Sequence, residues 1–171
     1  KELIEKGTIG EIVSMRAQFT CWYPKMENCW RQDVRLSGGG ALMDMGIHCI
    51  DLLQYLTNLK ATEVVALCGN QVYQYPDVED AGSAVLKMNN GALFTVESNF
   101  NVSDALGGCK FEIYGTKGAI FANGTIGQEE VGTVTITNSA GKTEEIPYTP
   151  GNMYTKEIDA LVRAIREQEE I

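Results

Sequence analysis

Residues 37–56 read SGGGALMDMGIHCIDLLQYL, an apolar run that opens on three glycines and contains few polar side chains. On a helix of about 3.6 residues per turn, positions i, i+4, i+7 and i+11 share one side. Four polar residues follow that spacing and form one stripe: Asp44, His48, Asp51 and Tyr55. Most of the remaining circumference is apolar, which predicts a buried helix. Because unpaired buried charge is costly, we expect the stripe to face partners or a wet cleft.

His48 is the single histidine of the chain and follows Asp44 by one helical turn. Side chains at this spacing can hydrogen-bond, and a nearby carboxylate favours the protonated imidazole and orients its ring. Such a pair is suited to general acid–base catalysis, and it also fits a purely structural pair. The buried character of the helix and the absence of another histidine favour the catalytic interpretation.

The composition excludes several classes of protein. The 171 residues are close to the size of one ordinary domain, and 44% are hydrophobic, which is enough for a sizeable core. A net charge of −9 argues against nucleic acid or an anionic membrane as a partner. Because no apolar stretch approaches the roughly 20 residues of a membrane span and no signal-peptide pattern opens the chain, we expect a cytoplasmic protein.

The five cysteines do not indicate a metal site or a disulfide framework. Their number is odd, none form a CxxC pair, and there is only one histidine to join them. We therefore expect free, buried thiols in a reducing compartment and no bound metal.

The rest of the sequence predicts one strand before the helix and a series of strands after it. Apolar and polar residues alternate over 11–22, which predicts a half-buried strand whose polar face includes Arg16. Further strands are expected at 63–68, 81–88, 92–100, 109–114, 119–122, 133–137 and 142–148. An amphipathic helix is expected over 153–169. This order is typical of an α+β domain: an open, largely antiparallel, mixed sheet with helices packed on one face.

Residues 23–36 precede the central helix and lack both periodicities, so we expect a loop. Loops with aromatic and arginine side chains beside a buried helix often line sites, and this one contains Trp30 and Arg31. A solvated connection anchored by Trp30 fits the same residues. We expect Ser37 to cap a helix that runs over about 40–56.

The triple glycine does not match a nucleotide-binding loop. A dinucleotide fingerprint needs a strand, a glycine-rich turn and a helix in that order. Here Met43 stands where the third glycine would be, and no apolar strand precedes the motif. The glycines at 115 and 118 are expected to form a turn between strands, and no Walker loop, GxSxG or HExxH motif is present.

The central helix resembles a motif of the C-terminal domain of the Gfo/Idh/MocA oxidoreductases, which include glucose–fructose oxidoreductase and inositol 2-dehydrogenase. The matching residues are Gly38, Gly39, Gly40, Leu42, Asp44, Gly46, His48 and Asp51. Similar matches occur at GTIGE (7–11), WRQD (30–33), ED (79–80), NGA (90–92), YGTKG (114–118) and the late helix at 154–165. The resemblance spans nearly the whole chain, so we interpret 1–171 as a single substrate-binding and oligomerisation domain.

The resemblance implies an enzyme in which a Rossmann domain binds NAD or NADP and precedes this α+β domain. In such enzymes hydride passes between the nicotinamide and a hydroxyl-bearing carbon of a sugar or cyclitol. By resemblance, His48 is the catalytic acid–base group at the reacting hydroxyl, and Asp44 binds a substrate hydroxyl and orients the site. We expect Trp30, Arg31 and Arg16 to bind the substrate.

The resemblance also implies that part of the active site lies outside this sequence. The catalytic lysine of the family belongs to a Glu-Lys-Pro motif of the first domain, whereas here Glu5-Lys6 is followed by Gly7. The chain opens on Lys1 in what resembles the tail of a helix, so we expect a piece of a longer protein. We expect no cofactor-binding residues in this chain, and neither tight cofactor binding nor turnover by the chain alone.

The open face of the sheet is expected to form a homodimer or homotetramer, as in the family it resembles. Two other functions fit the same residues. One is a non-catalytic binding or dimerisation module derived from that family. The other is a self-contained hydrolase or isomerase that uses Asp44 and His48, although no candidate nucleophile stands at a convincing spacing.

Overall fold

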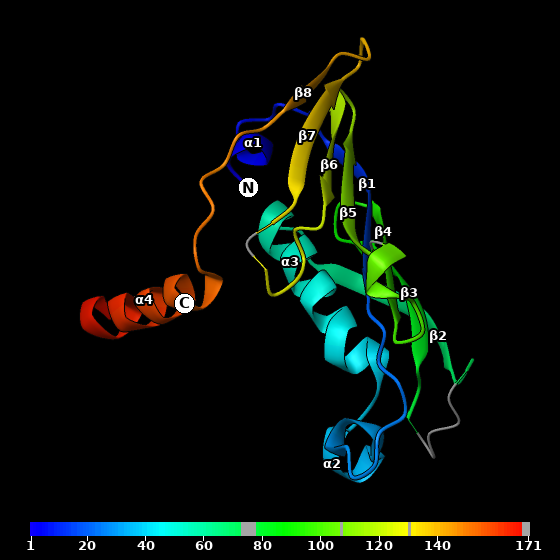
Figure 1. The fold of residues 1–171 in the computed structure, drawn as a ribbon. Helices are drawn as coiled ribbons and strands as arrows, with labels where there is room; N and C mark the ends of the chain where they lie inside the picture. Colours follow the sequence, from blue (N-terminus) through cyan, green and yellow to red (C-terminus); the bar gives the residue numbers. More distant parts are fainter. Residues whose placement is uncertain (73–77, 107, 130, 169–171) are drawn as a thin grey trace.

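The computed structural model describes residues 1–72, 78–106, 108–129 and 131–168, and an eight-stranded sheet organises them (Figure 1). The strands are β1 Ile12–Thr20, β2 Ala61–Gly69, β3 Ala81–Met88, β4 Leu93–Asn99, β5 Cys109–Gly115, β6 Gly118–Asn123, β7 Thr133–Asn138 and β8 Thr143–Glu145. Their order across the sheet is β2-β3-β4-β1-β5-β6-β7-β8. The β1–β4 pair is parallel and the other pairs are antiparallel. The predicted open, largely antiparallel, mixed sheet is confirmed.

Helices α1 and α3 cover one face of this sheet, and the opposite face is open (Figure 1). The helices are α1 Glu2–Glu5, α2 Val34–Ser37, α3 Ile47–Thr57 and α4 Met153–Glu167. Two short 3₁₀ turns, Trp30–Gln32 and Asp104–Leu106, and one π-helical turn, Leu42–Gly46, complete the described elements. Helix α4 projects away from the sheet at the end of the chain. In the described part of the chain, no helix combines the length and apolar character that crossing a membrane requires.

The core lies between the sheet and α3. One row of paired residues crosses five strands on this face: Leu86, Phe94, Met15, Ile113 and Ile120. All five are buried, and Cys49 and Leu53 of α3 pack against them. Fully burying one such side chain stabilises a fold by about 1.5–3 kcal/mol, so this row fixes both the register of the sheet and the position of the helix.

The segment between β1 and the central helix differs from its prediction. Residues 23–36 were expected to be a loop, but they include a 3₁₀ turn and most of α2. Ser37 is the last residue of α2, and its hydroxyl donates to the Asp33 carbonyl (3.1 Å). The prediction that Ser37 caps the central helix is therefore wrong. Because the Asp33 side chain accepts a hydrogen bond from the Arg35 amide, it caps α2 in the way that Asp favours at a helix start.

The central helix ends as expected but is less buried than expected. Asn58 closes it in the left-handed conformation. The prediction of burial nearly all round is wrong, since the apolar side chains of Met43 and Ile47 are 57% and 52% exposed. Only one side of the helix faces the sheet, and these apolar side chains lie outside that contact. The C-terminal helix ends at Glu167, two residues before its predicted end.

Candidate functional site

Glu79 contacts the start of the helix that contains the predicted acid–base pair. The Glu79 carboxylate accepts hydrogen bonds from the Gly40 amide (2.8 Å) and the Leu42 amide (3.2 Å). The Glu79 carbonyl accepts a third from the Ala41 amide (3.1 Å). The first amides of a helix have no partner within the helix and carry partial positive charge, so a carboxylate is well placed there. One residue therefore anchors three successive amides at the start of this helix.

The triple glycine has a structural explanation in the same contact. Gly38 ends α2 with φ of 78°, a left-handed conformation that glycine adopts at low cost. A Cβ at Gly40 would lie 1.7 Å from the Glu79 carbonyl oxygen, so no larger residue fits there. Because the Gly40 and Leu42 amides already donate to Glu79, they do not offer a cradle for a phosphate. These residues do not fit a dinucleotide cofactor.

The first turn of the helix is π-helical over Leu42–Gly46 and holds Asp44. Such turns are rare and are frequent at functional sites. A π turn holds about one residue more than an α turn, so the side chains that follow it are rotated about the axis relative to those of an unbroken α-helix. Among the described residues, Arg31 donates to Asp44 (Nε to Oδ1, 3.3 Å), whereas His48 does not. The i, i+4 spacing alone therefore does not pair Asp44 with His48.

Trp30 and Arg31 lie with Asp44 at one place on the surface. The Arg31 guanidinium stacks 4.4 Å from the centre of the Trp30 ring, and the indole is 50% exposed. The hydrogen bond to Asp44 raises the pKa of Arg31 above its usual value. The guanidinium, which is charged in any case, thus lies against a carboxylate. An aromatic face beside paired polar groups is an arrangement that binds the apolar face and the hydroxyls of a sugar ring.

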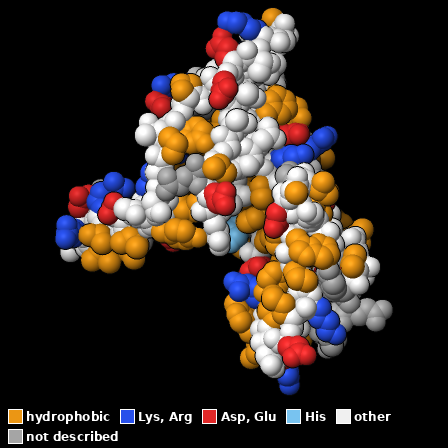
Figure 2. Space-filling model, viewed as in Figure 1, with side chains coloured by type: hydrophobic (Ala, Val, Ile, Leu, Met, Phe, Trp, Pro, Cys, Tyr) orange, Lys and Arg blue, Asp and Glu red, His pale blue; other side chains and the backbone are white. Residues whose placement is uncertain are grey.

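His48 lies on the next turn and is exposed at the surface (Figure 2). Its ring is 6.3 Å from the ring of Phe19, which lies on β1 beneath the helix. None of the described side chains hydrogen-bonds to the imidazole. Both ring nitrogens can therefore exchange a proton with a bound molecule, which is what a general acid or base requires.

Arg16 lies apart from this group. It belongs to β1, on the open face of the sheet, opposite to the face that α3 covers. Its Nη1 lies 4.0 Å from Glu112 Oε2 on β5. The structure brings Asp44, Trp30 and Arg31 together, with His48 on the same helix as Asp44, and it does not bring Arg16 to them.

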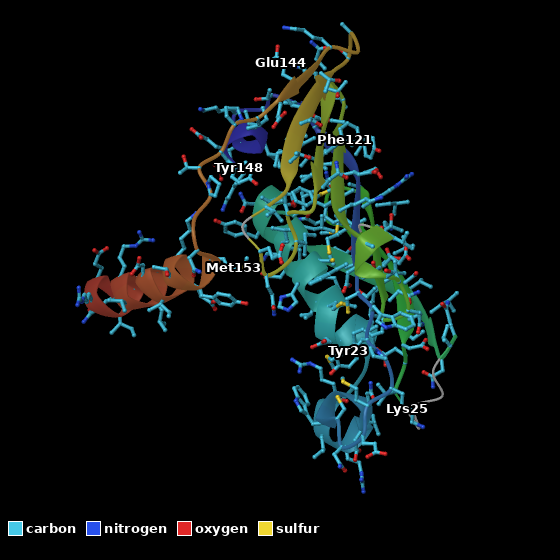
Figure 3. All side chains as sticks on the ribbon, viewed as in Figure 1. Tyr23, Lys25, Phe121, Glu144, Tyr148 and Met153 are labelled. Atoms are coloured by element: carbon cyan, nitrogen blue, oxygen red, sulfur yellow. The ribbon has the colours of Figure 1, made fainter. Side chains whose placement is uncertain are left out.

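Two residues at this end of the fold were not selected as site residues from the sequence. Glu79 had drawn attention only as part of the Glu79-Asp80 pair, just before an apolar strand. Tyr23, labelled in Figure 3, packs against the start of the helix at Ala41 and Met45, and its hydroxyl is 3.1 Å from Cys29 Sγ. Burial, together with the Cys29 contact, raises the pKa of Tyr23 to about 12 from an ordinary value of 10.0, so its hydroxyl stays protonated even in alkaline solution. In the described chain, no three His, Cys, Asp or Glu side chains cluster as metal ligands.

The chain belongs to the GFO/IDH/MocA family: residues 1–121 match its C-terminal domain. It is 28% identical over 165 residues to 1,5-anhydro-D-fructose reductase of Ensifer adhaerens, and the aligned region covers 96% of this chain and 49% of that protein. It is 32% identical over 129 residues to myo-inositol 2-dehydrogenase of Thermotoga maritima, with 72% of this chain and 36% of that protein covered. The chain thus spans about half the length, or less, of these curated relatives.

Solved structures share the fold. Aldose-aldose oxidoreductase from Caulobacter crescentus, complexed with glycerol, matches with a TM-score of 0.85 at 22% identity, over 99% of this chain and 50% of that one. Levoglucosan dehydrogenase in complex with NADH and levoglucosan matches with a TM-score of 0.79 at 26% identity, over 100% of this chain and 54% of that one. These relatives are oxidoreductases, and several of their names include a sugar or a cyclitol.

Proposed function

We propose that this chain is the substrate-binding domain of an NAD(P)-dependent oxidoreductase that acts on a hydroxyl-bearing carbon of a sugar or cyclitol. One observation supports this most strongly: an exposed imidazole lies on the same helix as a carboxylate that is held beside an arginine and an indole. The sugar and cyclitol oxidoreductases among its relatives support the substrate class.

In this proposal His48 takes the proton of the reacting hydroxyl during oxidation and returns it during reduction. Asp44 accepts a hydrogen bond from a second hydroxyl, and the hydrogen bond from Arg31 holds that carboxylate in place. The exposed Trp30 ring stacks on the apolar face of the sugar. These roles use only groups that reach the surface of the described domain.

The cofactor would be bound by another part of the whole protein, because the glycines of this chain do not fit a dinucleotide. A nicotinamide cofactor would supply the hydride acceptor. Helix α4 offers a surface against which such a part could pack: it has fifteen residues, and an apolar stripe along it is exposed, with Ile158 at 60% and Ile165 at 69% (Figure 2). An isolated amphipathic helix of this length is marginal in water, so it needs a partner.

The same proposal includes self-association through the open face of the sheet, to a homodimer or homotetramer. This face contains a shallow hollow of about 510 Å³. Its charged lining residues are Arg16, Glu97, Lys110 and Glu112. Because both signs are present, two copies of this face can complement each other across a two-fold axis.

One observation favours a second candidate, a non-catalytic binding module derived from the same family. Asp44 is paired with Arg31 rather than with His48, which suits ligand binding without proton transfer. The two candidates differ in what the loss of the imidazole does to turnover and to binding.

The test uses the whole protein with NAD and NADP and a panel of sugars and cyclitols. We expect His48→Ala to lower kcat by about 10²–10⁴-fold while the melting temperature and substrate binding change little. Tyr55→Phe, two turns further along the helix, is the control and should keep normal turnover. Turnover within a few fold of wild type in His48→Ala would end the catalytic assignment. The 171-residue chain alone should not oxidise any of these polyols.

A further inference from the structure

Strand β2 forms one edge of the sheet (Figure 1), and each of its residues is exposed. Its Val64 points to the helix-covered face and is still 63% exposed, while Val65 and Leu67 on the open face are 73% and 81% exposed. On its inner side β2 pairs with β3, and in the described chain no strand pairs with its outer side. The outer backbone N–H and C=O groups of a nine-residue strand are thus available.

The sequence of β2 is that of an interior strand. Residues 64–68 read VVALC, a continuous apolar run, which is typical of strands with neighbours on both sides and cover on both faces. Edge strands are normally protected from pairing by short length, charges, proline or bulges. The pairing of β2 with β3 is irregular only at its start, between Ala61 and Glu63, and it is regular from Glu63 to Gly69. The one charge of β2, Glu63, is already neutralised by Lys87 of β3 at 2.7 Å.

The opposite edge of the same sheet is protected in the usual way. Strand β8 has only three residues, Thr143–Glu145. Charged side chains cluster on and beside it, including Lys142, Glu144 (labelled in Figure 3) and Glu145. One edge of the sheet is therefore closed to further strands, and the other is built to accept one.

We propose that β2 pairs antiparallel with β2 of a second copy of this chain, so that one sheet continues across the dimer. A two-fold axis through Val65 places Glu63 of each copy opposite Leu67 of the other, so no like charges meet. The apolar run is complementary to itself, which is what a symmetric contact between identical strands requires. This contact involves the sheet edge, does not depend on the oxidoreductase proposal, and is separate from the contact proposed for the open face.

Two lysine variants separate edge pairing from packing of the open faces. Val64→Lys places its charge on the helix-covered face, and Val65→Lys places it on the open face beside the axis. Edge pairing predicts that each variant weakens self-association by about tenfold or more, because charge on either face of an edge opposes strand pairing. Thr135→Lys, on the open face of β7, is the control and should leave the edge contact intact.

Self-association is measured by sedimentation velocity over a concentration series, with circular dichroism to confirm that each variant is folded. Hydrogen exchange of the wild-type protein provides a test without any variant: the amides of 61–69 that point away from β3 should become protected as the dimer forms. The proposal is overturned if wild type stays monomeric, if only Val65→Lys weakens the dimer, or if the β2 amides exchange equally fast in monomer and dimer. The proposal would also be overturned if the β2 amides become protected only when another protein with an extended segment is added.

Discussion

The Glu79 carboxylate lies 2.8 Å from the backbone nitrogen of Gly40, a residue 39 positions earlier in the chain. This contact joins the segment that leads into β3 to the start of the helix that carries Asp44 and His48. A carboxylate that accepts hydrogen bonds from the backbone amides at the start of a helix stabilises the helix and also determines where it begins. The position of the candidate site therefore depends on a residue that does not belong to its surface.

Replacing Glu79 should destabilise the protein and disturb the site. Glu79→Ala leaves the Gly40 and Leu42 amides without their partner, which should lower the free energy of unfolding by about 1–3 kcal/mol. Urea denaturation measures this loss. Glu63→Ala removes a carboxylate whose side chain is 68% exposed, so it should change stability by no more than about 0.5 kcal/mol. Equal losses in the two variants would show that the contact has no special role.

Gly40→Ala should be more severe than Glu79→Ala. The added Cβ would lie 1.7 Å from the Glu79 carbonyl oxygen, so the backbone of one segment must move. We expect a loss of more than about 3 kcal/mol or failure to fold, as for other severe steric changes. Gly127→Ala is the matched control, because its Cβ meets no atom within 4 Å. A melting temperature of Gly40→Ala close to that of Gly127→Ala would contradict the predicted clash.

The sheet was predictable because its signals are local. Alternation over 11–22 predicted β1, and the apolar runs at 81–88 and 92–100 predicted β3 and β4, which are joined by a tight turn where Gly91 has φ of 89°. The strand order and the parallel β1–β4 pair depend on contacts far apart in the sequence, so no local pattern shows them. The Gfo/Idh/MocA resemblance led to the right family, while periodicity alone predicted only the fold class.

The arrangement of the candidate site was less predictable. The i, i+4 spacing placed Asp44 and His48 on one stripe, but that prediction assumed that the whole segment is an α-helix. The π turn at Leu42–Gly46 changes that geometry, and the cap by Glu79 comes from a distant segment. Arg16 was chosen for its place on a polar strand face, and alternation cannot tell which side of a sheet faces the site.

Arg31 should act on substrate binding rather than on stability. Its pair with Asp44 is partly exposed, with side chains 40% and 37% accessible, so Arg31→Ala should change the free energy of unfolding by less than about 1 kcal/mol. In the whole protein we expect KM for the sugar to rise about tenfold, because Asp44 loses the group that orients it. Arg35→Ala is the control, since Arg35 is 84% exposed and pairs with Asp33. An unchanged KM in Arg31→Ala would remove Arg31 from the site.

The buried thiol of Cys49 predicts a loss of stability at alkaline pH. Burial raises the pKa of Cys49 to about 12, from an ordinary value of 9.0. Above pH 9 the unfolded chain therefore loses this proton before the folded one does. The contribution of this thiol is complete below that pH and is lost as the pH rises toward 12, by about 1.4 kcal/mol per pH unit.

Urea denaturation from about pH 8 to about pH 10 measures this slope. Cys49→Ala should lower stability at the acid end of the range, because it leaves a small cavity, and should make the alkaline slope shallower than in wild type. Cys68→Ala removes an exposed thiol, so it should change the slope less. If Cys49→Ala and wild type lose stability in parallel across this range, the thiol of Cys49 is not held protonated by its burial between α3 and the sheet.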